Sequence, residues 1–415
     1  MLALTSALVA PYFIDWNHYR SAFEREAGRV LGREVRVEGS ARARLLPFPS
    51  LTFTDVVVAG KTPQAPGMTV DEFSMHAELA PFLRGEVLIF DMQLTRPHAQ
   101  IAIAADGGID WAVRPSGPFD ARQVTLENVS IVDGSVTLAH AASGRQHELT
   151  DIDAQLSARS LAGPWRIGGT LSLDDMPMRV SVSTGSLGDD GRMRVRFEAL
   201  PDDLPVRLAT DGQARIEEGA AFYDGAFALN TYSDEAVARL RKEAERPLAL
   251  TSAAATNRLT GLFDLRHDRL AVEQFRFETG PADAPYTAEG RASLELGGEP
   301  RFFISADGAQ LRFDGENDGD SASGGLDIAR RFEAFAALIR AVPSPTIPGE
   351  VAINLPAIVA GDTTIRNIEL RAEPAEGGWA VGSVAATLPG RTRFEANGFL
   401  ATDEELGFNG HMLLA

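Results

Sequence analysis

The stretch GREVRVEGSARARL (residues 32–45) decides the fold class of this chain. From Glu34 to Leu45, small or apolar residues alternate with charged or polar ones. Successive side chains of a β-strand point to opposite faces of a sheet, so a period of two predicts a strand with one buried and one solvated face. The side chains of Arg42 and Arg44 are expected on the solvated face.

The residues before this stretch predict an amphipathic helix over 15–31. Apolar residues recur there at spacings of three and four, which places them in one stripe along the helix. Asp15 is the expected N-cap, and Gly32 is placed to end the helix in the left-handed conformation. Two further helices are expected at 234–244 and 326–341 because apolar residues recur there with a helical period.

The strand pattern fills most of the remaining chain. Alternating runs predict strands around 72–79, 152–158, 178–182, 193–197, 275–277 and 351–355. The dipeptides Asp133-Gly134, Asp211-Gly212 and Gly297-Gly298 are expected to be turns between antiparallel strands. A hairpin pattern that starts at Gly169 is repeated from Gly290, which favours a stacked β architecture that grows by addition of strands.

A few short helices cannot cover the apolar face of so many strands. A sheet with one apolar face must bury that face against something. The sheet is therefore expected either to fold upon itself or to hold an apolar ligand. The predicted fold is mainly β: an elongated, curled antiparallel sheet with an open, taco-like groove, a few short helices and an N-terminal membrane-anchor helix.

The composition argues against several classes of protein. The chain of 415 residues has a net charge of −19, which opposes binding to nucleic acid and also attachment to anionic lipid through a basic face. It contains no cysteine, so neither disulfides nor thiolate metal sites are available. No nucleophile elbow, phosphate-binding loop or dinucleotide fingerprint occurs. We predict no enzymatic activity, no catalytic residues, no metal and no cofactor.

The apolar, uncharged segment Met1–Ile14 predicts part of a membrane helix. At 1.5 Å per residue it reaches about 21 Å, short of the roughly 30 Å hydrocarbon core. A cleaved signal peptide is disfavoured because no positively charged region precedes Leu2. We expect the outer half of a transmembrane anchor whose first turns precede this sequence, with Tyr12, Phe13 and Trp16 at the membrane interface. The alternative is a buried core helix.

Six motifs follow one another in order over residues 11–111. They are Pro-Tyr-Phe-Ile-Asp-Trp at 11–16, Leu-Gly-Arg-Glu-Val at 31–35, Leu-Leu-Pro-Phe-Pro-Ser-Leu at 45–51, Ala-Pro-Phe-Leu-Arg-Gly-Glu-Val at 80–87, Arg-Pro at 96–97 and Asp-Gly-Gly-Ile-Asp-Trp at 106–111. This series resembles the AsmA family of bacterial envelope proteins. Beyond residue 111 the chain is similar to the repetitive β body of that family, with Leu161–Pro164 as a typical piece.

The resemblance implies three regions. They are a truncated transmembrane anchor at 1–14, a chorein-like helix and β region at 15–115, and a repetitive β-groove body at 116–415 that is cut short at its C-terminus. The chain would cross the bacterial inner membrane once, with its body in the periplasm. The implied function is outer-membrane biogenesis, by carriage of phospholipids between the two membranes as a bridge-like lipid transfer protein. The implied partners are phospholipids, the inner membrane and outer-membrane assembly proteins.

An apolar groove would lower the free energy needed to move a lipid through water. An exposed acyl chain costs about 0.8 kcal/mol per CH₂, and the inward side chains of each strand would remove that cost while the headgroup stays solvated. The predicted lipid-facing residues are Val35, Val37, Leu45, Leu51, Phe53, Phe73, Met75, Leu156, Val180 and Val182. The alternative for each is a place in the packed core of a β-sandwich.

Two other functions stay open on the sequence. One is an envelope scaffold that affects outer-membrane protein assembly without carrying lipid. The other is a secreted β-repeat adhesin or polysaccharide-acting protein. An adhesin or enzyme is expected to have both sheet faces satisfied by protein, with polar clefts, whereas a conduit is expected to have a continuous exposed apolar channel.

Overall fold

The computed structural model describes residues 20–44, 49–60, 66–78, 87–110, 124–160, 163–233, 255–280, 285–313, 345–360, 363–402 and 407–415. Strands dominate these residues, so the prediction of a mainly β, curled and open sheet with few helices is confirmed. The chain divides into two compact units, which we call unit 1 (residues 1–229 and 265–267) and unit 2 (residues 230–264 and 268–415). The segment 1–14, the boundary at 115 and the helices expected at 234–244 and 326–341 lie outside the described residues.

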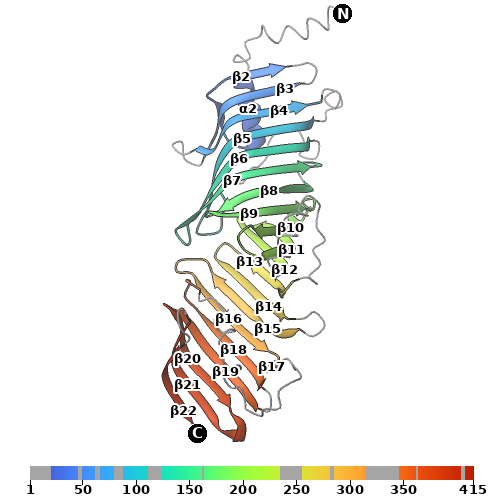
Figure 1. Cartoon of the computed structure of the whole chain (residues 1–415). Coiled ribbons are helices and arrows are strands. Elements are labelled where there is room, and N and C mark those ends of the chain that lie inside the picture. The colour runs from blue at the N-terminus through green and yellow to red at the C-terminus, as the bar shows by residue number, and fades with distance from the viewer. Residues whose placement is uncertain are drawn as a thin grey trace, which may run out of the picture. The chain divides into compact units, whose positions relative to one another are not determined.

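Unit 1 is a curled sheet that starts beside a single described helix (Figure 1). Strands β3 to β11 pair in chain order, and both β1 and β2 pair with β3. The elements are α2 (Arg20–Leu31), β1 (Val35–Val37), β2 (Ala41–Arg44), β3 (Ser50–Ala59), β4 (Pro66–Ala77), β5 (Val87–Ile103), β6 (Val124–His140), β7 (Arg145–Ala158), β8 (Trp165–Leu173), β9 (Met176–Thr184), β10 (Arg192–Pro201), β11 (Val206–Glu217) and β12 (Ala220–Thr231), whose last two residues belong to unit 2.

Unit 2 repeats this construction. Strands β14 to β16 and β18 to β22 pair in chain order, and the short β17 pairs with β18. The elements are β13 (Asn257–Leu265), β14 (Arg269–Thr279), β15 (Tyr286–Glu295), β16 (Arg301–Gly308), β17 (Leu311–Phe313), β18 (Gly349–Ala360), β19 (Thr363–Ala375), β20 (Gly378–Thr387), the 3₁₀ turn η5 (Pro389–Arg391), β21 (Arg393–Ala401) and β22 (Gly407–Leu414).

Parallel pairing occurs at three places among the described strands, although an antiparallel sheet was expected throughout. They are β5 with β6, β16 with β18 and β17 with β18. A parallel pair needs a crossover connection of a dozen residues or more, and the segments 104–123 and 314–348 supply that length. The side-chain period is two in both directions of pairing. The alternation of residues therefore could not reveal which pairs are parallel.

The strand expected from 34 to 45 is divided into β1 and β2. Between them the chain bends at Gly39, where a Cβ would meet the side chain of Thr54 and the carboxylate of Asp55. Asp55 has a φ of 53° and forms the bulge opposite this bend. Two further local predictions are confirmed: Arg42 and Arg44 are exposed, and Gly32 ends α2 with a φ of 67°. Asp15, the expected N-cap, lies outside the described residues.

Two of the three predicted turns are wrong. Asp133-Gly134 lies inside β6, where Asp133 has a φ of 55° and the register with β7 shifts, so the dipeptide marks a bulge. Asp211-Gly212 lies inside β11, where a Cβ on Gly212 would meet the carbonyl oxygen of Asp224. There the glycine permits close approach of the backbones. Gly297-Gly298 does separate β15 from β16, as predicted.

The repeated hairpin pattern is confirmed as two antiparallel pairs, β8–β9 and β15–β16. Gly169 pairs with Val180 in the first, and Gly290 pairs with Ala306 in the second. In both positions a Cβ would collide with a neighbouring strand, at the carbonyl oxygen of Asp153 for Gly169 and at that of Ser305 for Gly290. The glycines of the repeat are therefore required by strand packing.

Replacement of Gly169 by alanine tests this packing. We expect Gly169→Ala to lower the free energy of unfolding by about 1–3 kcal/mol, since the added methyl group must displace a strand. The matched control is the adjacent Gly168→Ala, because a Cβ there meets no atom within 4 Å. The control should be neutral or stabilise by about 0.5–1 kcal/mol. Equal effects in chemical denaturation would contradict the assignment of the close approach to Gly169.

Candidate functional site

Helix α2 packs on the first strands of unit 1. The ring of Phe23 stacks on that of Phe53 with centroids 3.8 Å apart, and it lies 6.3 Å from the ring of Phe73. Ala27 and Leu31 of the same helix face pack against this cluster. The cluster also contains Val35 and Val37, which are buried like Phe53. The helix therefore covers one end of the sheet with its apolar stripe.

The strand register of unit 1 aligns apolar side chains in rows that run from strand to strand. Paired residues of neighbouring strands lie side by side on the same face. Row 1 takes one residue from each of eight strands, β3 to β10. It consists of Leu51, Met75, Met92, Val129, Leu156, Ile167, Val182 and Phe197.

A second row runs beside the first on the same face. In each of the strands β3 to β10, its residue lies two positions from the row 1 residue. Row 2 consists of Phe53, Phe73, Leu94, Ile131, Ala154, Gly169, Val180, Ala199 and Leu208, from β3 to β11. We call the surface made by these two rows and their same-side neighbours the apolar face of unit 1.

Unit 2 has a comparable face. One row crosses it from β14 to β22 through every strand but β17. It consists of Phe275, Gly290, Ala306, Ile353, Leu370, Val384, Ala396 and Met412.

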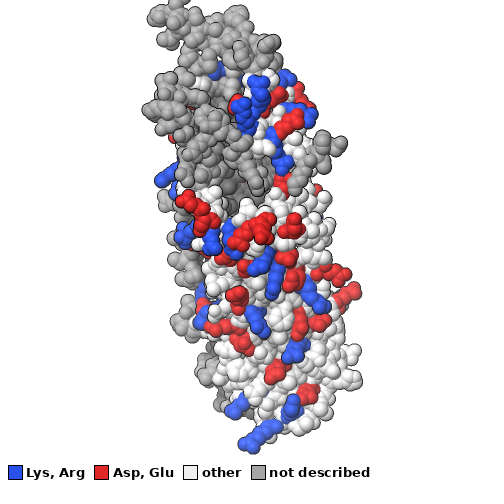
Figure 2. All heavy atoms as spheres, turned by 180° about the vertical axis from the view of Figure 1, so that it is seen from behind, with Lys and Arg blue, Asp and Glu red and all other residues white. Residues whose placement is uncertain are grey.

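The opposite face of unit 1 is polar. In β10 the side chains of Arg194 and Arg196 alternate with the apolar ones and lie on the far side from row 1. Both arginines bind Asp211 of β11, with nitrogen–oxygen distances of 2.7–2.9 Å. The hydrogen bond from Arg194 is the main cause that lowers the pKa of the Asp211 carboxyl to about 2. Figure 2 shows acidic and basic side chains interspersed over much of the surface that it presents.

Row 1 is mostly half-buried. Of its eight residues only Val129 is buried, at 6% exposure. Further along the same face, Leu173 of β8 and Met176 of β9 pair with each other and are 37% and 40% exposed. Among the described residues, α2 is the only α-helix, and it packs on the cluster that starts at β1. Most side chains of row 1 are thus partly exposed.

The structure brings together nine of the ten predicted lipid-facing residues on this one face. Row 1 contains Leu51, Met75, Leu156 and Val182, and row 2 contains Phe53, Phe73 and Val180. Val35 and Val37 of β1 pair with Val58 and Val56 of β3 and pack in one cluster with Phe53 and Leu51, so they join the same side of the sheet. Leu45 lies outside the described residues, as do the predicted interface residues Tyr12, Phe13 and Trp16.

Met92, Val129, Ile167 and Phe197 complete row 1, although the sequence did not single them out as lipid-facing. Met92 and Val129 lie on the parallel pair β5–β6, whose neighbours in space are far apart in sequence. Phe197 belongs to a run already recognised as alternating, so its period could have placed it on this face. Only the register shows that these residues link the predicted ones into a continuous row.

The described residues show no further chemical centre. Within them, no group of three or more histidine, aspartate and glutamate side chains could hold a metal ion. In the same part of the chain, no helix combines the length and the apolar composition needed to span a bilayer. Comparisons of the chain with protein-family models, curated proteins and solved structures gave no match. The curled sheet with its apolar face is therefore the candidate functional site.

The ion pairs of Asp211 predict a pH dependence of stability. The pKa of this carboxyl is lower in the folded chain than the ordinary value of about 3.9, so its stabilising effect is complete above about pH 4 and is lost as the pH falls toward about 2. Asp211 is 39% exposed. We therefore expect Asp211→Asn to lower the free energy of unfolding at pH 7 by less than about 1 kcal/mol.

Urea denaturation of both proteins at several pH values measures this effect. The difference between wild type and Asp211→Asn should shrink below about pH 4 and vanish near pH 2. Asp190→Asn is the control, because that exposed carboxylate lies 4.0 Å from the Arg192 guanidinium, and the asparagine oxygen can still accept the hydrogen bond from the backbone N–H of Arg192. A difference for Asp211→Asn that persists or grows at low pH would contradict the assigned ion pairs.

Proposed function

We propose that the protein carries phospholipids, with their acyl chains against the apolar face and their headgroups in water. The observation that carries the proposal is the continuity of row 1, which has an apolar residue on each of eight successive strands. Removal of acyl CH₂ groups from water contributes about 0.8 kcal/mol each, whatever the position along the row. A lipid bound in this way could therefore slide.

The dimensions support this use of the face. Neighbouring strands lie about 4.8 Å apart, so eight strands extend a row over about 34 Å along the sheet. Half of the roughly 30 Å hydrocarbon core of a bilayer corresponds to one acyl chain. The face of unit 1 is thus long enough for an acyl chain to move along it by more than its own length.

The resemblance to the AsmA family supplies the cellular setting of the proposal. In that setting the segment 1–14 belongs to an inner-membrane anchor, the body lies in the periplasm, and the lipids move between inner and outer membranes during outer-membrane biogenesis. A scaffold without lipid cargo would use the same fold but would have no need of an open apolar row. That difference makes lipid contact the property to measure.

Photo-crosslinking from the two faces of the sheet tests lipid contact. A photoreactive residue at Leu156 or Val182 should crosslink phospholipid, because both side chains lie in row 1. The matched controls are Gln155 and Ser181, their chain neighbours on the opposite face. We expect at least several-fold more lipid adduct, measured by mass spectrometry, from the row positions. Equal yields from both faces, or no adduct and no co-purifying phospholipid, would leave the scaffold as the better interpretation.

A charge placed in the rows should block movement of lipid. We expect Val180→Asp with Val182→Asp to reduce phospholipid transfer between vesicles by about tenfold or more, because a carboxylate among acyl chains is costly. Ser181→Asp adds the same kind of charge on the opposite face and should leave transfer within about twofold of wild type. Circular dichroism checks that both proteins retain their strands. Unchanged transfer by the folded double variant would refute movement along this face.

A further inference from the structure

The N-terminal segment of the described chain is basic although the chain as a whole is acidic. Residues 20–44 contain seven arginines and four glutamates, a net charge of +3, whereas the whole chain carries −19. In Figure 2, basic side chains gather near the N-terminal end, and the two signs are mixed over the middle of the chain. A segment with positive net charge is therefore present in a chain whose overall net charge is negative.

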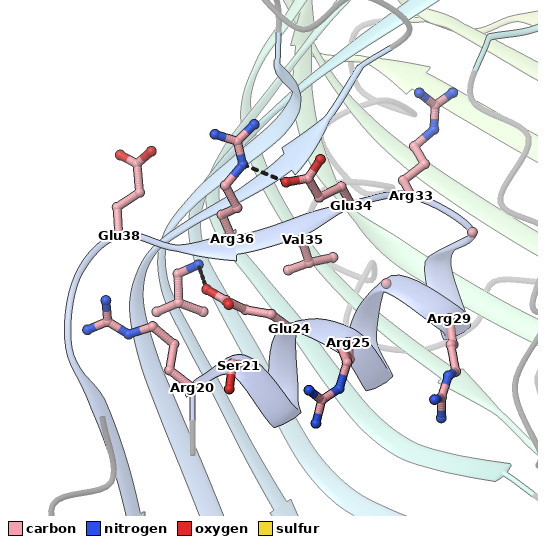
Figure 3. A pocket seen from close by; sticks show the side chains of 13 residues that line it. Arg20, Ser21, Glu24, Arg25, Arg29, Arg33, Glu34, Val35, Arg36 and Glu38 are labelled. Carbon is pink, nitrogen blue, oxygen red and sulfur yellow. Dashed lines mark hydrogen bonds and ion pairs between the residues drawn. The ribbon is translucent and has the colours of Figure 1, made fainter. Parts of the chain in front are cut away.

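These arginines border an open hollow between α2 and β1. The hollow has a volume of about 920 Å³, and its lining includes Ser21 and Val35. Arg25 and Arg29 lie on the α2 side of the hollow, and Arg36 lies on the β1 side (Figure 3). Arg25 and Arg29 are one helical turn apart, on the helix face opposite Phe23. The side chains of Arg25 and Arg29 extend from α2 away from β1, and that of Arg36 extends from β1 away from α2, so the guanidinium groups lie along the two outer borders of the hollow (Figure 3).

Two of these arginines form exposed ion pairs with glutamates nearby in the chain. At the edge of β1 that faces α2, the backbone N–H of Val37 donates a hydrogen bond to Glu24 Oε1 at 2.8 Å. Arg29 binds Glu26 at 2.7 Å and Arg36 binds Glu34 at 3.1 Å, and all four side chains are more than half exposed. Ion pairs of such exposure contribute little to stability. The guanidinium groups can therefore exchange these carboxylates for another anion.

We propose that this surface, made by Arg25, Arg29 and Arg36 around the hollow, docks to a membrane surface that contains anionic phospholipids. Guanidinium groups bind phosphate oxygens in a bidentate manner, and several arginines near an anionic membrane add their attractions. The surface adjoins β3, the strand on which both apolar rows begin. Docking would bring the start of the rows to the lipids, and this consequence rests on the proposed function.

Vesicle flotation of the full chain tests the docking. The partition of the protein is measured with vesicles of phosphatidylcholine and with vesicles of equimolar phosphatidylcholine and phosphatidylglycerol. Apolar insertion contributes to both partitions, so their ratio reports the electrostatic attraction. Substitution of Arg25, Arg29 and Arg36 by glutamine should lower this ratio by about tenfold or more, and salt should lower the wild-type ratio. A ratio unchanged by the triple substitution would overturn the proposal.

Two matched triple variants control for net charge and for folding. Substitution of Arg269, Arg276 and Arg393 by glutamine removes the same charge from exposed positions of unit 2. It should leave the ratio within about twofold of wild type, and an equal fall in both glutamine variants would mean that only net charge matters. Arg→Lys at the three docking positions should retain most of the ratio. A loss as large as with glutamine would contradict attraction to the membrane surface.

A second readout separates this proposal from the proposed function. Crosslinking of phospholipid to a photoreactive residue at Val182 is measured in mixed detergent micelles, where no membrane surface is present. The glutamine variant of the docking surface should crosslink there as well as wild type. Loss of crosslinking in the variant would show that its defect is not confined to docking. Absence of crosslinking in wild type would refute lipid carriage. It would have no bearing on the docking proposal, which the vesicle ratio tests separately.

Discussion

The backbone pairing of neighbouring strands is the constraint on which the apolar face depends. Because the side-chain period of a strand is two, a slip of one residue between any two strands would move all apolar side chains beyond that point to the other face. The parallel pair β5–β6 illustrates this requirement on the register, since Met92 must pair with Val129 for row 1 to continue. Bulges such as the one at Asp133 absorb extra residues and restore the alignment.

The apolar face of unit 1 is covered by a helix at one end and is partly exposed further along. At β3 and β4 the aromatic contacts of Phe23 with Phe53 and Phe73 complete a small core, with α2 taking the place of a second layer. Along β7 to β10 most described residues of the same face are half-buried. A single construction therefore combines a part that stabilises the sheet with a part that remains able to bind an apolar ligand.

Much of the fold could be predicted from the sequence because period two is a local property. The run from Met178 to Val182 and the helix stop at Gly32 needed only their immediate neighbours. The parallel pairs could not be predicted, since they depend on where long connections return. Glycine was ambiguous for a similar reason: Gly212 looks like a turn residue, but it serves the close approach of two strands. The site residues were found singly, and only the register joined them into rows.

The most direct test of the central claim uses Trp165, which lies on the apolar face of β8 and packs against the buried cluster around Val129. In a variant with phenylalanine at Trp16, Trp111 and Trp379, the fluorescence of Trp165 is measured with phospholipids whose acyl chains do or do not carry bromine, a contact quencher. If acyl chains lie against the apolar face, the brominated lipid alone will clearly quench this fluorescence. Identical fluorescence with both lipids, while the lipid is bound, would contradict this placement of the acyl chains.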